Sequence, residues 1–331
     1  RRSRAPHRAG SPHRILGWIG VRRALLLVGI VLAAILAGAC AGAPVRPPAP
    51  PSSLDAAVDA GERLCSCRIG VAARHLESGL VYERNGDERF EAASVIKIAV
   101  LTDAMAAVSE GRVDLSERWT LTGGNKASES GWLQLFDPGL NPTWNDLLML
   151  MVGPSDNTAT NAWIDRLGIE NVNARMESLG FTSIRLLSLL PWQDPAAPGP
   201  RWTGFRFGTV TPHEVVEWFS RVGRGELLDA ESSRRIFHYL DTAPSRARIA
   251  RRFSSAALWA GKTGTMSGVR NDAGILRTSK GRFVLVVFTD RSPAANDTAA
   301  THPAVVAIGE IARVIVDEWS RNLPDIAGEP R

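Results

Sequence analysis

Ser94 and Lys97 are the residues in this sequence whose spacing most directly suggests chemistry. A serine and a lysine three positions apart share one face of a helix, and the apolar run at 98–101 predicts a helix here. At a helix start, unpaired N–H groups and the helix dipole favour negative charge that develops beside the serine. An apolar setting favours the neutral lysine, which can then accept the serine proton. Taken alone, the pattern also fits a serine cap before a buried helix.

Two further polar motifs follow along the chain, Ser155-Asp156-Asn157 and Lys262-Thr263-Gly264. The first lies between two predicted helices, where serine, aspartate and asparagine are also common as turn and cap residues. The second ends an apolar strand, where an exposed lysine is unremarkable. Each motif therefore has a purely structural alternative, and only their combination argues for a site.

In this order and spacing, the three motifs resemble the set typical of class A β-lactamases and penicillin-binding proteins. Ser94 and Ser155 are 61 positions apart, and Ser155 and Lys262 are 107 apart, close to the intervals of that family. The resemblance covers about residues 55–325. It is supported by three further segments, 157–161, 209–212 and 268–272.

The resemblance implies an acyl-transfer site. Ser94 would be the acylated nucleophile and Lys97 its proton partner. Ser155 would pass a proton to the leaving nitrogen, and Lys262 would supply positive charge nearby. Asn157 would hydrogen-bond the amide side chain of the substrate. No metal and no organic cofactor is expected.

The same resemblance implies a substrate-binding strand that contains Thr263, Gly264 and Thr265. Thr263 and Arg270 would hold the substrate carboxylate, a role that suits a fixed guanidinium. The backbone N–H groups of Ser94 and Thr265 would form the oxyanion hole. Trp132 would either wall the pocket or belong to the core.

One position departs from the family pattern. Class A β-lactamases release the acyl group with a glutamate in a long loop, and alignment of residues 179–186 puts Leu190 at that position. Residues 178–213 contain no glutamate, and Asp194 is their only carboxylate. Loss of a general base typically costs roughly 10²- to 10⁴-fold. Acylation is therefore expected to survive where hydrolysis fails.

The basic charge of the chain is concentrated at its start. The 331 residues carry a net charge of +5, but residues 1–40 hold seven arginines and no acid. The remainder is close to neutral, so no nucleic-acid partner is expected. Arg22-Arg23, the apolar run 24–36 and small residues before Cys40 predict an export signal. They resemble a lipobox, which would make Cys40 the lipidated first residue; plain secretion and an uncleaved anchor are the alternatives.

Residues 41–53 form a proline-rich, semi-rigid linker in this interpretation. Cys65 and Cys67 come next, separated only by Ser66. Their spacing is too short for an easy unstrained disulfide, and two cysteines are too few for a zinc site. We expect buried structural thiols.

The apolar patterns predict an α+β fold, an α/β sandwich. Helices are expected over 54–64, 145–151, 158–167, 169–179, 212–221, 230–240 and 303–320. Strands are expected over 68–73, 80–83, 258–264, 272–276 and 283–289. Strands at both ends of the chain predict one antiparallel sheet flanked by helices, within a domain over 54–325. Residues 98–250 would form a helical insertion, and residues 186–212 a long irregular loop.

These observations lead to an exported serine hydrolase, monomeric in the cell envelope, that β-lactams acylate at Ser94, with β-lactam amide hydrolysis as its nominal reaction. Its partner would be a β-lactam or a peptidoglycan-derived small substrate. The N-terminal lipid or uncleaved anchor would attach the protein to the membrane. One alternative is a D-alanyl-D-alanine peptidase or another cell-wall amidase. The other is a penicillin-binding lipoprotein without turnover, because the loop glutamate is missing.

Overall fold

The computed structural model describes residues 52–190, 205–242, 244–293 and 299–327. The predicted export signal, Cys40 and all but the last residues of the proline-rich linker lie outside these ranges, so they stay predictions. Asp194, in the long loop, also lies outside the described ranges.

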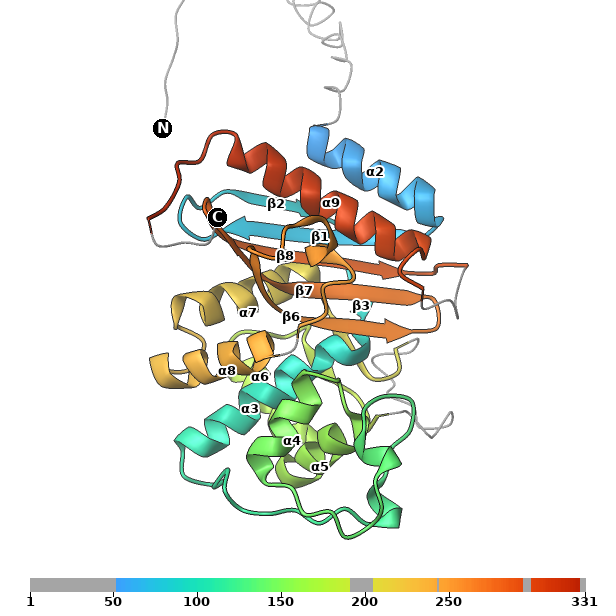
Figure 1. Cartoon of the computed structure of the whole chain (residues 1–331), viewed down its shortest axis with the longest axis vertical. Helices are drawn as coiled ribbons and strands as arrows, with labels where there is room; N and C mark the ends of the chain where they lie inside the picture. Colours follow the sequence, from blue (N-terminus) through green and yellow to red (C-terminus); the bar gives the residue numbers. More distant parts are fainter. Residues whose placement is uncertain (1–51, 191–204, 243, 294–298, 328–331) are drawn as a thin grey trace, which may run out of the picture. The chain divides into compact units, whose positions relative to one another are not determined.

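A five-stranded antiparallel sheet combines strands from both ends of the chain, in the order β2-β1-β8-β7-β6 (Figure 1). Its strands are β1 (Arg68–His75), β2 (Val81–Arg84), β6 (Leu258–Met266), β7 (Val269–Thr278) and β8 (Gly281–Asp290). Strand β8 is buried along nearly its whole length, as expected for a strand with packed layers on both faces. The predicted α+β class and the sheet built from both termini are confirmed.

Two helices cover one face of this sheet, α2 (Ser53–Cys65) and α9 (Pro303–Ser320) (Figure 1). Their apolar sides share a buried cluster with the sheet, to which Val58, Ile69 and Ile308 belong. Such a two-layer arrangement is how an amphipathic helix buries its apolar stripe. Within the part of the chain that the structure describes, no helix is both long and apolar enough to cross a bilayer.

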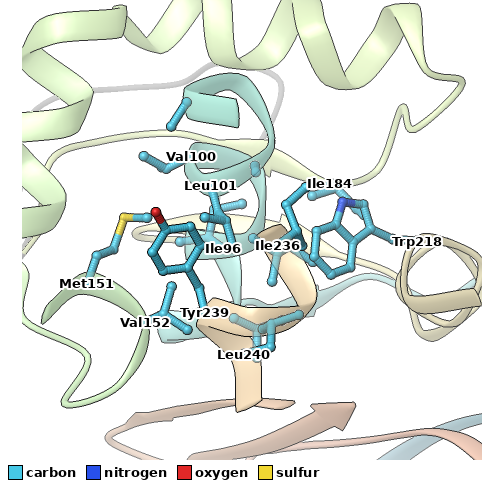
Figure 2. Close-up of a cluster of buried hydrophobic side chains, with 14 of the residues drawn as sticks. Ile96, Val100, Leu101, Met151, Val152, Ile184, Trp218, Ile236, Tyr239 and Leu240 are labelled. Atoms are coloured by element: carbon cyan, nitrogen blue, oxygen red, sulfur yellow. The ribbon is translucent and has the colours of Figure 1, made fainter. Parts of the chain in front are cut away.

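The opposite face of the sheet carries the helical part of the chain. Its helices are α3 (Lys97–Ser109), α4 (Trp144–Val152), α5 (Asn157–Leu167), α6 (Ile169–Ser178), α7 (Pro212–Arg224) and α8 (Ala230–Thr242). Every residue of α3 from Lys97 to Ala107 is buried. A helix that is buried on all sides is held by its neighbours, and Figure 2 shows its Val100 and Leu101 among side chains of α4, α7 and α8.

A second, small sheet joins the two ends of the long loop. It pairs β3 (Phe90–Glu91) with β5 (Gly208–Val210), and β5 with β4 (Arg185–Leu186). The sequence predicts only irregular structure over 186–212, because two- and three-residue strands leave no alternation to detect. This ladder fixes both ends of the loop beside the segment that leads into Ser94.

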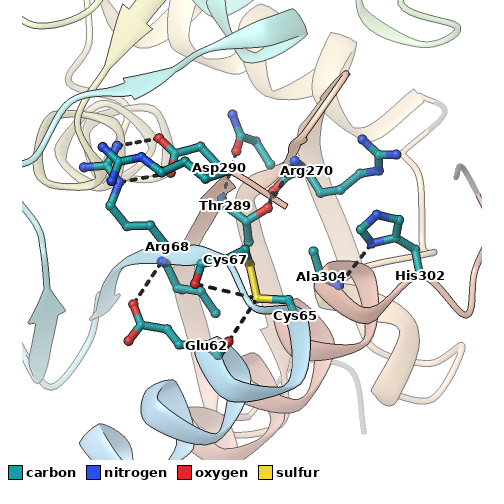
Figure 3. The surroundings of a disulfide bond; sticks show 12 residues. Glu62, Cys65, Cys67, Arg68, Arg270, Thr289, Asp290, His302 and Ala304 are labelled. Atoms are coloured by element: carbon teal, nitrogen blue, oxygen red, sulfur yellow. Dashed lines mark hydrogen bonds and ion pairs between the residues drawn. A yellow bond between two sulfur atoms is a disulfide. The ribbon is translucent and has the colours of Figure 1, made fainter. Parts of the chain in front are cut away.

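Cys65 and Cys67 form a disulfide, so the expectation of free buried thiols is wrong (Figure 3). Their Cα atoms are 5.1 Å apart, within the usual range for a disulfide. The intervening Ser66 adopts a left-handed conformation with φ 49° where α2 ends. That turn brings the two side chains together, a conformation that the spacing of the two cysteines does not indicate.

Candidate active site

Ser94 lies in a 3-10 turn, η1 (Ala93–Ile96), that runs directly into α3. The turn follows β3 and packs against β6, where a Cβ on Gly264 would lie 2.7 Å from the carbonyl oxygen of Ala92. Only glycine permits this close approach of strand to turn. Ala93 has a φ of +46°, which is unusual for a residue other than glycine. The half-buried Ser94 hydroxyl makes no hydrogen bond with any residue that the structure describes.

The Lys97 ammonium position is fully enclosed, with the side chain only 1% exposed. Nζ donates to Ser155 O at 2.5 Å and to Asn157 Oδ1 at 2.9 Å, and it lies 3.1 Å from Ser155 Oγ. Burial lowers the pKa of Lys97 well below its ordinary value, and the nearby Lys262 lowers it further. A neutral amine has two N–H donors and one lone pair. With both donors bound to oxygen atoms, the lone pair is available to a hydroxyl.

Ser155 links the two lysines. Its Oγ lies 3.1 Å from Lys97 Nζ and accepts a hydrogen bond of 3.0 Å from Lys262 Nζ. Burial and the neighbouring Arg248 lower the pKa of Lys262 to about 7. Ser155 has a φ of +59°, a conformation that costs energy outside glycine and often marks a functional position. Lys97 and Lys262, which are 165 positions apart in the sequence, thus share one hydroxyl group.

The other two residues of this motif, Asp156 and Asn157, bind the backbone of the segment 128–132. Asp156 is fully buried; it caps α5 through Ala159 N–H and accepts Trp132 N–H at 2.6 Å. The Asn157 amide donates to Ser128 O at 2.9 Å. The Trp132 side chain is 58% exposed, so the alternative of a core tryptophan is wrong. The backbone N–H of Trp132 is bound by Asp156, the residue after Ser155. The exposed indole is compatible with the predicted position at the wall of the pocket.

Arg270 is placed differently from the expectation. Its side chain is 1% exposed, and its guanidinium donates to the carbonyl oxygens of Met266 and Val269. The next residue, Asn271, turns to the opposite face and donates to Glu91 O. Alternation along β7 therefore directs Arg270 to the α9 side of the sheet, where Figure 3 shows it near His302. The predicted strand began at residue 272 and missed this alternation.

Arg248 approaches the site instead, from the segment just before η4 (Ile249–Arg252). Its guanidinium donates to Gly264 O at 2.8 Å and to Thr265 Oγ1, two atoms of β6. Asp272 lies beside it, fully buried, and burial raises the pKa of this carboxyl to about 7. The sequence carries no signal for Arg248, because it lies in an arginine-rich stretch without periodicity. Only the fold shows its proximity to Lys262 and Thr265.

Leu190 occupies a tightly held position. Its backbone N–H donates to Asn161 Oδ1 at 2.8 Å, and its carbonyl accepts from Asn161 Nδ2 at 2.6 Å. Asn161 lies one helical turn beyond Asn157, the partner of Lys97, so this pairing fastens Leu190 to the helix that carries the site. The side chain is 1% exposed. The structure thus puts a hydrocarbon, with no titratable group, at the loop position next to α5.

Comparison with known proteins agrees with this geometry. A sequence model described as the beta-lactamase enzyme family matches residues 53–319. The chain belongs to this family. Its fold is that of class A β-lactamases.

Three of the proteins similar to this chain illustrate the range of the matches. Beta-lactamase AER-1 of Aeromonas hydrophila is 24% identical, over 77% of this chain and 83% of the relative. The crystal structure of a β-lactamase from Sphaerobacter thermophilus has 32% identity and a TM-score of 0.72, covering 82% of this chain and 98% of that one. A leucine-to-glutamate mutant of PBP-A, an acyl-enzyme complex with penicillin G, has 28% identity and a TM-score of 0.69, covering 82% and 100%. The family relation implies a serine hydrolase.

Proposed function

We propose that this protein is an exported serine hydrolase that β-lactams acylate at Ser94, with hydrolysis of the β-lactam amide as its reaction. One observation carries the proposal: Ser155 Oγ lies within 3.1 Å of the amines of both Lys97 and Lys262, next to the turn that holds Ser94. A proton path from nucleophile to leaving nitrogen requires this arrangement. The predicted roles of Lys97, Ser155 and Lys262 fit these contacts.

Acylation begins with Ser94 Oγ. As it attacks the carbonyl carbon, its proton passes to the lone pair of neutral Lys97, and the C–N bond breaks from the tetrahedral intermediate. The leaving nitrogen takes a proton from Ser155 Oγ, and Ser155 recovers one from Lys97. Charge on the carbonyl oxygen is stabilised by the N–H groups of Ser94 and Thr265. The Ser94 hydroxyl would align with Lys97 when substrate binds, since catalytic hydrogen bonds often tighten only in the substrate complex.

The substrate carboxylate is assigned here to Thr263 and Arg248 rather than to Arg270. Arg248 already donates to Thr265 Oγ1, so its guanidinium lies along the strand that the substrate would follow. A planar guanidinium binds a carboxylate in a fixed geometry. Lys262 adds positive charge on the same side. Gly264 keeps the strand close to Ser94, and Asn157 and Trp132 bind the acyl side chain.

Hydrolysis of the acyl-enzyme is the slow step in this proposal. Water needs a base to attack the ester, and Leu190 supplies none. A second candidate function follows from the same observation, a penicillin-binding protein that stays acylated. The likeness to PBP-A supports it, since PBP-A is among the similar structures and its leucine-to-glutamate mutant forms an acyl-enzyme with penicillin G.

Export and anchoring complete the proposal. The basic and apolar run before Cys40 supports an exported chain in the cell envelope, held by a lipid on Cys40. Labelled palmitate incorporated into the expressed chain, and lost in Cys40→Ala, would test the anchor. Label retained by the variant would contradict it.

Function is tested by mixing the purified protein with a chromogenic cephalosporin and recording absorbance and intact mass together. Sustained colour supports the hydrolase. A stoichiometric burst with a lasting mass adduct supports the penicillin-binding alternative. Release of D-alanine from a D-alanyl-D-alanine peptide would point to a cell-wall peptidase. A folded protein that gives neither adduct nor turnover would defeat every β-lactam function.

A further inference from the structure

A cavity of about 520 Å³ lies where the turn end of the β7–β8 hairpin meets the helices α7 and α8. Figure 1 shows these helices against the sheet face opposite α2 and α9. Arg277, one of the lining residues, pairs with Leu258 of β6, four positions before Lys262. Four strand residues span about 13 Å, so the cavity is separate from the lysine of the Ser94 site.

The lining of this cavity has an excess of positive charge. Its four arginines come from four elements: Arg224 from α7, Arg234 from α8, Arg277 from β7 and Arg282 from β8. Among the lining residues that the structure describes, Glu77 is the one carboxylate. A concave surface lined mainly by one sign of charge concentrates ions of the opposite sign. The four arginines therefore favour an anionic ligand.

Two of the four arginines, Arg277 and Arg282, are directly opposed in the β7–β8 ladder. They share a face of the sheet with Ile275, because residues two apart on a strand point to the same side. Like charges at directly opposed positions destabilise a sheet. An anion bound between the two guanidiniums would remove this cost.

The Arg282 guanidinium is held in position for such a ligand. Its Nε donates to Glu77 Oε1 at 2.6 Å, and one Nη donates to Gly223 O at 2.6 Å. The other Nη makes no hydrogen bond with any residue that the structure describes. A guanidinium fixed in this way loses little side-chain freedom when a ligand binds.

The two helix arginines, Arg224 and Arg234, also keep donors for a ligand. Arg224 donates through Nε to Glu226, and Arg234 donates through one Nη to Glu231. These two carboxylates are 57% and 54% exposed, so water and salt screen both pairs. A guanidinium has five N–H donors, and each of these pairs uses the donors of one nitrogen.

The arrangement suits a phosphate group better than a carboxylate. One guanidinium fork is enough to bind both oxygens of a planar carboxylate, whereas a phosphate presents three or more oxygens in tetrahedral directions. Several arginines from different elements can then bind it together. Apolar side chains complete the lining at Val222, Phe237 and Ile275. They would contact a hydrocarbon group attached to the phosphate.

We propose that this cavity is a binding site for an organic phosphate, whose anionic group the four arginines bind and whose hydrocarbon part lies on the apolar lining. This inference goes beyond the proposed function, and it does not depend on an acyl group at Ser94. The phosphate belongs either to a soluble ester or to a lipid headgroup, which present the same chemistry.

Isothermal titration calorimetry of the purified protein tests the site, with hexyl phosphate as the probe and hexanoate as a carboxylate with the same number of carbon atoms. We expect saturable binding of hexyl phosphate at one site. Its affinity should exceed that of hexanoate by roughly ten-fold or more, the scale of one additional charged hydrogen bond. The affinity should fall as the salt concentration rises. Absence of saturable binding, or equal affinity for hexanoate, would overturn the inference.

Variants locate the bound phosphate. Arg277→Gln should weaken hexyl phosphate binding by about ten-fold or more, and Arg224→Gln and Arg234→Gln by about two- to five-fold each. The two helix variants keep the test decisive if Arg277→Gln proves unstable. Arg235→Gln is the matched control, since Arg235 also binds Glu231, at 3.0 Å, but lies outside the lining. Its affinity should equal that of the unmodified protein, and equal affinity in all of the variants would contradict the proposal.

The Ser94 site is the main competitor for an anion, because it contains Lys262 and Arg248. Hexyl phosphate binding should therefore be unchanged in Arg248→Gln. Binding that is lost in Arg248→Gln and kept in the cavity variants would overturn the inference. None of these measurements depends on acylation, so the proposed function and this inference can fail separately.

Two further probes distinguish the source of the phosphate. Competition between glycerol 1-phosphate and hexyl phosphate would support a soluble ester. Binding to phosphatidylglycerol vesicles that is weakened in Arg277→Gln, without competition by glycerol 1-phosphate, would support a lipid headgroup.

Discussion

Two segments near Ser94, one with α5 and β6 and the other in the long loop, differ in polar chemistry. On the side of α5 and β6, the buried Lys97 and Lys262 and the half-buried Ser155 are joined by hydrogen bonds of 2.5–3.1 Å. On the side of the long loop, Asn161 holds the backbone of Leu190, and a leucine side chain fills the position. Hydrogen bonds hold both positions, but among the described residues only the side with Lys97, Ser155 and Lys262 carries groups suited to proton transfer.

This difference separates the two halves of an acyl-transfer reaction. The polar cluster contains what acylation needs, a base with a lowered pKa and a hydroxyl that relays a proton. The loop position is equally well held, yet it contributes no base for the attack of water. A site can therefore keep recognition and acylation while it loses release, because different segments of the chain supply them.

Removal of the nucleophile should have the largest effect. Ser94→Ala deletes the only atom that forms the ester, so the mass adduct and any turnover should fall by at least about 10³-fold. The half-buried position tolerates alanine, so circular dichroism and the melting temperature should match the unmodified protein. A persistent adduct in the variant would place the acyl group elsewhere.

A base added to the loop should remove much of the difference between the two sides. Leu190→Glu should raise the deacylation rate constant by roughly 10²- to 10⁴-fold while acylation changes little. Leu190→Gln is the matched control, with a similar shape and no base. The measurement is the decay of the mass adduct after excess β-lactam is removed. A variant that is merely less stable, with no faster decay, would show that the loop does not face the ester.

The choice between two arginines can be tested on the polar side. Arg248→Gln should lower kcat/KM for acylation by about 10- to 100-fold, because a charged hydrogen bond to the substrate carboxylate is lost. Arg270→Gln should change it much less, since this guanidinium binds carbonyl groups of its own turn. Stopped-flow acylation of both variants decides the assignment. The reverse ranking would restore the contact first expected for Arg270.

The pKa of about 7 at Lys262 predicts a pH limit. Below that pH the amine is protonated and supplies charge to the carboxylate and to Ser155; above it the charge is lost. The value of kcat/KM for acylation should therefore decline above about pH 7, up to ten-fold per unit. Lys262→Arg keeps its charge and should remove this decline. An identical alkaline limb in the variant would mean that another group titrates.

The smallest effect is expected at the disulfide, which belongs to neither of the two segments compared above. Cys65 and Cys67 are two positions apart, and closing so short a loop stabilises by only about 1–2 kcal/mol. The double change Cys65→Ser, Cys67→Ser should lower the free energy of unfolding by that amount in a urea titration. Acylation rates should not change. A changed acylation rate would indicate that α2 is coupled to the site.

Much of the fold was predictable because its elements are long and regular. The terminal helix 303–320 and the strands near 258 and 283 follow directly from apolar periodicity. The order of the strands follows from two simple expectations. Strands that are neighbours in the sequence pair as hairpins, and strands from the two ends of the chain meet in one sheet. The two-residue strands β3 and β4 carry no such pattern and were missed.

The sequence by itself determined the chemical set of Ser94, Lys97, Ser155 and Lys262, and the absence of a glutamate around Leu190. Residue types and intervals along the chain are sufficient for that. Only the tertiary structure decided that Arg270 faces away from Lys262, that Arg248 lies beside Gly264 and Thr265, and that the turn at Ser66 lets Cys65 and Cys67 form a disulfide. Those outcomes depend on which face of a strand meets which layer and on one residue's φ. Such properties arise when distant segments pack, and no local pattern carries them.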